Sequence, residues 1–202
     1  MARNNLTNPY KSDTIEAGSE KSSSKTGDTD GMSKITGIKS IDFNDKTAIM
    51  NEINNFAKKY AYANVEHALE ISPNGNMYSL IGTTLDVDSI IIGKEALKGS
   101  ISIHNHLIET GKNKGDSFSI KDLWFAAENN LGKQYVISGQ RRDAFEFVEY
   151  YTRDEIDSAW NKARNVMWER HIKNETTVIF EHEDVLRELN LFLEGFKFYE
   201  NF

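Results

Sequence analysis

Two histidines and one aspartate in the middle of the chain have the types and spacing of a metal-binding site. His104 and His106 stand two residues apart, at the end of the apolar run Ser100–Ile103. Alternate side chains of an extended strand point to the same side, so both imidazoles can reach one ion. Asp122 follows at the start of a segment with helical periodicity. Three protein ligands with a fourth position left for water are typical of a catalytic zinc site.

The segment around these residues contains the elements that must position them. Asn74-Gly75 is the strongest hairpin signal in the chain. Ser119 is an expected N-cap, since its hydroxyl can accept a hydrogen bond from a helix N–H. The elements expected in order are a strand over Val65–Ile71, a return strand over Met77–Ile81, a short strand over Asp88–Ile92, a short helix over Lys94–Lys98, a central strand over Ser100–His104 and a helix over Ile120–Asn130.

Further elements are expected on both sides of this segment. Asp45 is positioned to cap a helix over Lys46–Tyr60, whose apolar residues fall at intervals of three and four. After the central segment we expect a strand over Gln134–Ser138, an edge strand containing Phe145 and Phe147, a helix from Thr152, a final helix over His182–Gly195 and an aromatic C-terminus. The two helices are expected to pack on the sheet or on a protein partner.

The first 44 residues differ in composition from the rest of the chain. They are rich in serine, threonine, asparagine, glycine and charged residues, and Ser22–Gly31 has almost no apolar side chain. Such a segment buries too little apolar surface to offset its ordering entropy. We therefore expect a disordered tail or linker over residues 1–44, a domain over 45–150 and a helical C-terminal extension over 151–202.

The order of these motifs resembles the JAB/MPN metalloprotease family. His-x-His, a loop and Ser-x-x-Asp look like the JAMM motif of that family, and His104-Asn105-His106 is most similar to its RadC-like branch in bacteria and phages. The likeness covers about residues 48–140 and includes Gly82-Thr83. It implies an α+β, α/β/α-like fold with a mixed sheet flanked by helices. Leu107 stands where the family has proline, and the loop Leu107–Phe118 is longer than usual.

The resemblance also implies an activity and roles for individual residues. It implies a zinc-dependent hydrolase in which His104, His106 and Asp122 bind Zn²⁺ and a water attacks a peptide or isopeptide bond of a protein substrate. Glu66 corresponds to the family's general base, and Ser119 to its donor to the oxyanion. Glu70 lies on the same side of the strand as Glu66 and stays the competing candidate for the base.

Composition limits the alternatives. The 202 residues carry a net charge of −7, which argues against a broad nucleic-acid surface. A contiguous His-Asn-His is also not the dispersed pattern of an HNH nuclease. The chain contains no cysteine, so thiolate metal sites and disulfides are excluded. Without an apolar run long enough for a membrane span or a secretory signal, we expect a cytoplasmic protein, including that of a phage-infected bacterium.

A second reading assigns the chain to a different functional class. A non-catalytic JAB-like module, such as a phage head-associated, accessory or anti-defence protein, would use the fold for contacts with a protein partner. The aromatic C-terminus favours this reading, since exposed aromatic residues are enriched at interfaces. His67, His171 and His182 have no partner at ligand spacing, and structural or surface roles are expected for them.

Overall fold

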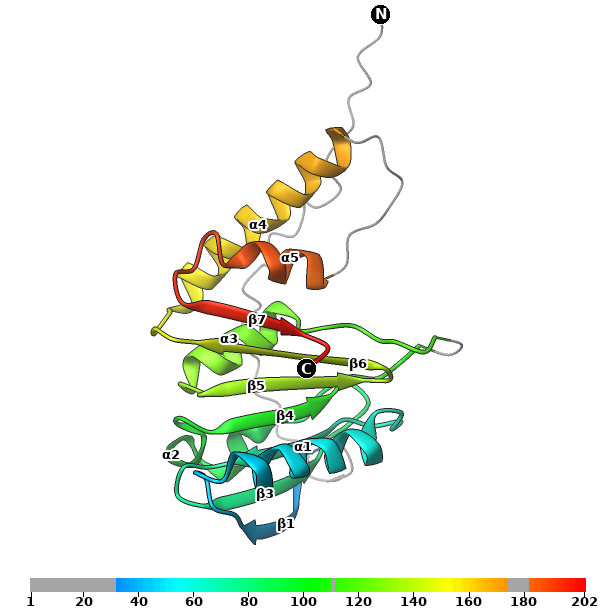
Figure 1. The fold of residues 1–202 in the computed structure, drawn as a ribbon, viewed down its shortest axis with the longest axis vertical. Coiled ribbons are helices and arrows are strands. Elements are labelled where there is room, and N and C mark those ends of the chain that lie inside the picture. Colours follow the sequence, from blue (N-terminus) through cyan, green and yellow to red (C-terminus); the bar gives the residue numbers. More distant parts are fainter. Residues whose placement is uncertain (1–31, 110–111, 174–181) are drawn as a thin grey trace, which may run out of the picture.

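The computed structural model describes residues 32–109, 112–173 and 182–202, and the part of the chain that it describes is built around one mixed sheet (Figure 1). The sheet has seven strands in the order β1-β3-β2-β4-β5-β6-β7. Neighbouring strands are antiparallel except β4 and β5, which are parallel. The strands are β1 (Lys34–Ser40), β2 (His67–Ile71), β3 (Asn76–Ile81), β4 (Ile101–Asn105), β5 (Lys133–Ser138), β6 (Arg141–Phe147) and β7 (Phe196–Glu200).

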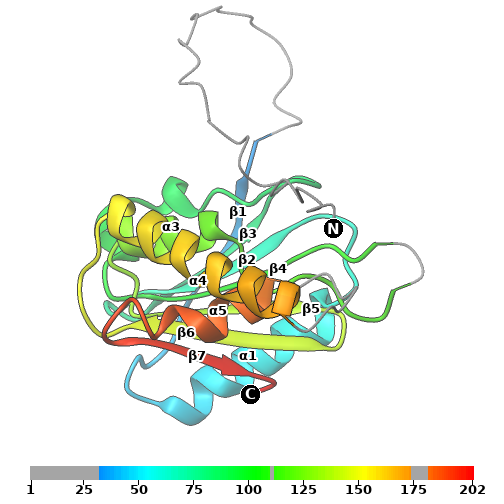
Figure 2. The ribbon, with the colours of Figure 1, turned by 90° about the horizontal axis from the view of Figure 1, so that it is seen from above.

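Helices cover both faces of the sheet. The helices are α1 (Lys46–Tyr60), α2 (Lys94–Leu97), α3 (Ile120–Glu128), α4 (Arg153–Lys173) and α5 (His182–Leu189), with a 3-10 helix η2 (Ser89–Ile92). Figure 2 shows α1 on one side of the strands and α3 and α4 on the other. Each side has its own apolar core: α1 packs on Leu69, Ile71, Ile103 and Ile137, whereas α3, α4 and α5 pack on Val136 and Phe145. The expectation of an α+β fold with a mixed sheet flanked by helices is therefore confirmed.

The helix α1 has the N-cap and the buried face that its sequence predicts. Asp45 Oδ1 accepts hydrogen bonds from the backbone N–H groups of Thr47 and Ala48, so the predicted cap is present. The residues that α1 buries against the sheet are those with the predicted helical spacing: Ile49, Ile53, Phe56 and Ala57. The hairpin between β2 and β3 also lies where it was predicted. Its turn ends at Gly75, whose φ of +85° is accessible to glycine at little cost.

The unit β4–α3–β5 is the part of the fold that creates a site. Parallel neighbouring strands need a crossover connection, and here the long loop after β4 and the helix α3 supply it. In open sheets built of parallel strands, ligands bind beyond the carboxyl ends of the strands, where a helix begins, and β4, α3 and β5 form one such parallel unit here. The carboxyl end of β4 carries His104, and the first turn of α3 carries Asp122.

Three expectations about individual elements are wrong. Asp88–Ile92 is not a strand: residues 89–92 form η2, and Asp88 Oδ1 accepts from the Ile90 N–H as its cap. The strand with Phe145 and Phe147 is not at the edge, because β7 pairs with β6 along its length. The final helix ends at Leu189 instead of Gly195, and the aromatic C-terminus forms β7. The helices α4 and α5 and the strand β7 thus complete the sheet and its core, so this part of the chain is not only a helical extension.

The expected tail also contains a strand. Residues 34–40, placed in the tail on composition, form β1 and pair with β3 at the edge of the sheet. The pairing uses backbone hydrogen bonds while most side chains stay exposed, so the segment lacks the alternating apolar pattern of a half-buried strand. Residues 1–31 of that prediction lie outside the described residues.

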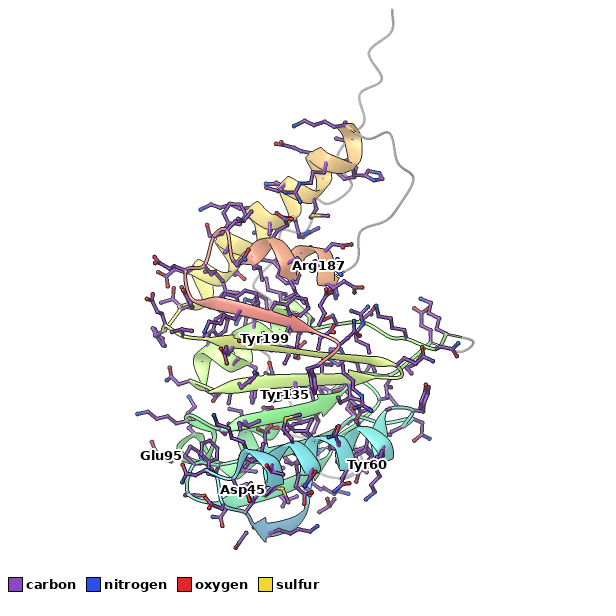
Figure 3. The ribbon with its side chains drawn as sticks, viewed as in Figure 1. Asp45, Tyr60, Glu95, Tyr135, Arg187 and Tyr199 are labelled. Atoms are coloured by element: carbon purple, nitrogen blue, oxygen red, sulfur yellow. The ribbon has the colours of Figure 1, made fainter. Side chains whose placement is uncertain are left out.

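A buried ion-pair network joins β6, α5 and the long loop before α3. Arg141 is 1% exposed and donates to Asp143, to Glu183 and to the carbonyl oxygen of Gly115. Ser117 Oγ donates to Asp143 Oδ2 at 2.7 Å. Arg141 thereby fixes the loop leading to α3. On the far side of α5, Arg187 pairs with Glu200 of β7, next to Tyr199 (Figure 3).

Candidate metal centre

The predicted ligands converge on one point. His104 Nε2 lies 3.0 Å from His106 Nε2 and 3.4 Å from Asp122 Oδ1, and His106 Nε2 lies 3.7 Å from Asp122 Oδ2. The donor atoms of the three residues all lie within 4.8 Å of one another, so one metal ion can bridge them. Two imidazoles and one carboxylate are a donor set suited to zinc.

Burial keeps the imidazole of His104 in the form that binds metals. His104 is 5% exposed, and burial lowers its pKa to about 4 against the opposing attraction of Asp122. A histidine must be neutral to bind a metal ion, and this one is neutral over the physiological range. Burial alone would raise the pKa of Asp122, but His104, His106 and hydrogen bonds from Ser119 outweigh it and hold that pKa below its usual value. The site therefore presents a neutral imidazole at His104 and a carboxylate at Asp122.

The first turn of α3 holds the aspartate in place. Ser119 occupies the N-cap position, as predicted, and its backbone N–H and its hydroxyl both donate to Asp122 Oδ2, at 2.7 and 2.8 Å. The turn is a capping box, in which the N-cap serine and the residue three positions later bind each other's groups. Such a reciprocal arrangement fixes the rotamer of the carboxylate. It leaves Asp122 Oδ1 toward His104.

Glu66 lies at the same cavity, just before β2. Its backbone continues the strand pairing, because its N–H donates to the carbonyl oxygen of Thr83 and its carbonyl oxygen accepts from Gly82. Burial raises the pKa of Glu66 to about 7, and His106 and Asp122 are the next largest influences, with opposite signs. The carboxyl group of Glu66 therefore lies close enough to His106 and Asp122 to interact with them electrostatically. No such coupling acts on Glu70, whose pKa depends on burial, Ser89 and Ser102.

Asn105, between the two histidines, connects the ligand strand to the segment that carries Glu66. Its side chain points to the opposite side from the imidazoles, as the alternation of a strand requires. Asn105 Oδ1 accepts from the His67 N–H at 2.7 Å, and Nδ2 donates to the Val65 carbonyl oxygen at 3.2 Å. Asn105 thus binds the backbone on both sides of Glu66. This role was not predicted from the sequence, although an amide inside an apolar strand is a usable signal.

The cavity beside the ligands is large enough for part of a substrate. Its volume is about 480 Å³, and its lining includes Glu66, Ser119 and all three predicted metal ligands. Its inner end is formed by Glu70, Ser102 and Gln134, which stand side by side on β2, β4 and β5. The sequence analysis considered only Glu70 among these. Ser102 was detectable as the residue two positions before His104 on the same face.

The buried carboxyl of Glu70 makes the stability of the fold dependent on pH. Burial raises the pKa of Glu70 to about 8 from 4.5, although hydrogen bonds from Ser89 and Ser102 oppose this. The folded state then holds the proton more tightly than the unfolded chain. The stabilisation contributed by this group is fully present below about pH 4.5 and is lost as the pH rises through 8.

We expect Glu70→Gln to remove this pH dependence. Between pH 5 and pH 9 its free energy of unfolding should rise relative to wild type by on the order of 3 kcal/mol, since each pKa unit corresponds to about 1.4 kcal/mol. Urea unfolding of the metal-free proteins at pH 5, 7 and 9 measures this difference. Glu95→Gln, an exposed substitution on α2, is the control and should follow wild type. Parallel profiles for Glu70→Gln and wild type would contradict the assignment.

Histidines outside the site have the roles expected of them. His67 stacks on Tyr60 of α1, with ring centroids 3.9 Å apart, and His171 stacks on Trp168. No helix among the described residues is both long and apolar enough to cross a membrane.

The fold and the site together define a mixed α+β protein with a candidate His-His-Asp metal centre at the carboxyl end of a parallel strand. Comparisons with protein-family models, with curated proteins and with solved structures found no match for this chain.

Proposed function

We propose that this protein is a zinc-dependent hydrolase that cleaves a peptide or isopeptide bond. The observation that carries the proposal is the convergence of His104, His106 and Asp122 on one point, at a cavity that Glu66 also lines. A base of raised pKa beside a three-ligand metal site is the pairing that metal-assisted hydrolysis requires. The similarity of the motif order to the JAB/MPN family supports the same assignment.

Each residue has a defined task in this proposal. Zinc held by the three ligands would supply Lewis acidity, which lowers the pKa of water toward about 7. Glu66 accepts a proton from the attacking water and delivers it to the leaving amine. Ser119 lines the cavity, and its hydroxyl can turn from Asp122 Oδ2 to the developing oxyanion. The Ser119 backbone N–H then still holds that carboxylate oxygen in place.

Zinc analysis is the direct test. Purified wild-type protein dialysed against zinc should retain about one ion per chain, measured by plasma mass spectrometry. His104→Ala removes the most buried ligand and should abolish retention. His171→Ala, on α4 outside the site, is the matched control and should bind zinc like wild type. Absence of zinc from the wild-type protein would refute the proposal.

Asn105 gives a separate prediction, because it contacts the backbone beside the base and not the metal. Asn105→Ala should lower the catalytic rate by about 10²-fold, the usual cost of misplacing a reacting group by about 1 Å. Zinc retention should stay near one ion per chain. Measuring both quantities on one preparation separates this positioning role from a ligand role. A parallel loss of zinc and rate would contradict it.

The alternative is a non-catalytic interaction module, which the aromatic C-terminus favoured. Tyr199 of that segment is exposed. Phe196 and Phe198 of β7 instead pack in the core formed with α3, α4 and α5.

A further inference from the structure

Two buried oxygen atoms at the inner end of the cavity have no hydrogen-bond partner among the described residues. Glu70 is fully buried and Gln134 is 2% exposed. Glu70 Oε1 accepts from Ser89 Oγ at 2.6 Å and from Ser102 Oγ at 2.8 Å. Glu70 Oε2 and Gln134 Oε1 have no partner, although both residues line the cavity. Leaving a buried polar atom unpaired costs about 1–3 kcal/mol, so a ligand that donates to both atoms would recover this cost.

A ligand that meets the ionised form of Glu70 must donate hydrogen bonds. The hydroxyl hydrogens of Ser89 and Ser102 are already used on Glu70 Oε1, so the neighbouring hydroxyls leave the two free oxygens unpaired. A primary ammonium carries three N–H donors and no acceptor, so it can donate to more than one acceptor oxygen at once. A hydroxyl has one donor and can satisfy only one of them.

The charges around the cavity favour the same ligand. Its lining contains four carboxyl groups, those of Glu66, Glu70, Asp86 and Asp122, and one ammonium group, that of Lys121. A bound zinc ion would offset part of this excess negative charge near His104, His106 and Asp122. The inner end of the cavity lies farther along the strands from these ligands. Because the pKa of Glu70 is about 8, an adjacent cation can bring this carboxyl into its ionised form near neutral pH.

The distance to the metal centre matches one long side chain. Ser102 precedes His104 by two residues on β4, which separates the acceptor row from the ligand row by about 7 Å. Val87 and Phe125 line the same cavity and offer apolar contacts to an alkyl chain. An extended lysine side chain is of comparable length.

We propose that Glu70, Ser102 and Gln134 form a subsite for the ammonium group of a lysine-like side chain next to the scissile bond. The subsite stands on the geometry of these residues, while its place beside a scissile bond rests on the proposed hydrolase function. The two parts are therefore tested separately.

The first experiment uses metal-free protein and a probe that cannot bind zinc. Titration with n-butylammonium, followed by amide chemical shifts, should perturb residues of β2 and β4 around Glu70 and Ser102, and n-butanol should not. Glu70→Gln should weaken n-butylammonium binding at least tenfold, and Glu95→Gln should leave it unchanged. Gln134→Leu, which removes the second acceptor, should also weaken it. Equal responses to n-butylammonium and n-butanol, or equal binding by wild type and both cavity variants, would overturn the subsite.

The second experiment links the subsite to the metal centre. Lysine hydroxamate and norleucine hydroxamate share a zinc-binding group and an α-amine but differ in the terminal ammonium. In zinc-loaded wild type, calorimetry should give lysine hydroxamate at least tenfold tighter binding, and in Glu70→Gln a ratio near one. Equal affinity of the two for wild type overturns the placement beside the metal. Failure of both hydroxamates to bind refutes the zinc site, while the n-butylammonium result still decides on the subsite.

Discussion

Replacing Glu66 by glutamine is expected to lower the rate of zinc-dependent peptide hydrolysis by about 10²–10⁴-fold, the usual contribution of a general base. Glutamine keeps the size and hydrogen-bonding capacity of the side chain but cannot accept the proton of the attacking water. The backbone of this residue is fixed by Thr83, Gly82 and the Asn105 clamp, so the fold should not change. Rates are measured on zinc-loaded protein with a peptide library and mass spectrometry.

Two controls show whether the lost activity is due to the base at Glu66. Zinc retention by Glu66→Gln should equal that of wild type, which shows that the loss is not one of metal. Glu70→Gln removes the competing candidate for the base. It is expected to change which peptides are cleaved rather than to abolish cleavage. A Glu66→Gln protein with wild-type activity, or a Glu70→Gln protein with none, would exchange the two assignments.

The largest loss of stability is expected for Arg141→Met. Removing the guanidinium leaves Asp143, 1% exposed, and Glu183, 7% exposed, as buried carboxylates without their main partner. Breaking a buried pair from one side costs about 3–5 kcal/mol. Because Arg141 also donates to the Gly115 carbonyl oxygen, the loop before α3 should loosen as well. Urea denaturation at neutral pH measures the change in the free energy of unfolding.

The neighbouring arginine provides a matched control. Arg142 is half-buried and donates one hydrogen bond, to Asn54 Oδ1. Arg142→Met should therefore cost only about 1 kcal/mol. Combining Arg141→Met with Asp143→Leu and Glu183→Met should recover part of the loss, because a fully apolar replacement of a buried ion network is often tolerated. Equal effects of the two arginine substitutions would show that the network contributes little.

Apolar periodicity and capping residues predicted those helices, strands and turns that are marked by their own local sequence pattern. The apolar face of α1, the Asn74-Gly75 turn and the β4 strand followed from local patterns. The same patterns located His104, His106 and Asp122, because alternation in a strand and the first turn of a helix are local properties. Their convergence within 4.8 Å depended on the parallel pairing of β4 with β5, which the local pattern alone does not determine.

Elements stabilised by distant partners were not predictable in the same way. β1 is held by backbone pairing with β3, and its exposed side chains carry no periodic signal. The segment of β7 reads as an aromatic tail until β6 is known to have a free edge beside it. Arg141 looks like a surface residue because its partners, Asp143 excepted, lie more than twenty positions away in the chain. In each case the deciding contact joins segments that are far apart in sequence.

The hydrogen bonds from Ser119 to one oxygen of Asp122 have a consequence for ion selectivity. With Oδ2 engaged by two donors, Asp122 offers a cation a single oxygen, Oδ1. Calcium prefers six to eight oxygen ligands and often a bidentate carboxylate, and magnesium binds imidazole poorly. Neither alkaline-earth ion is suited to a site of two imidazole nitrogens and one carboxylate oxygen. Cobalt, nickel and copper are, so these are the ions expected to compete with zinc, copper most strongly, whatever the concentration of calcium around the protein.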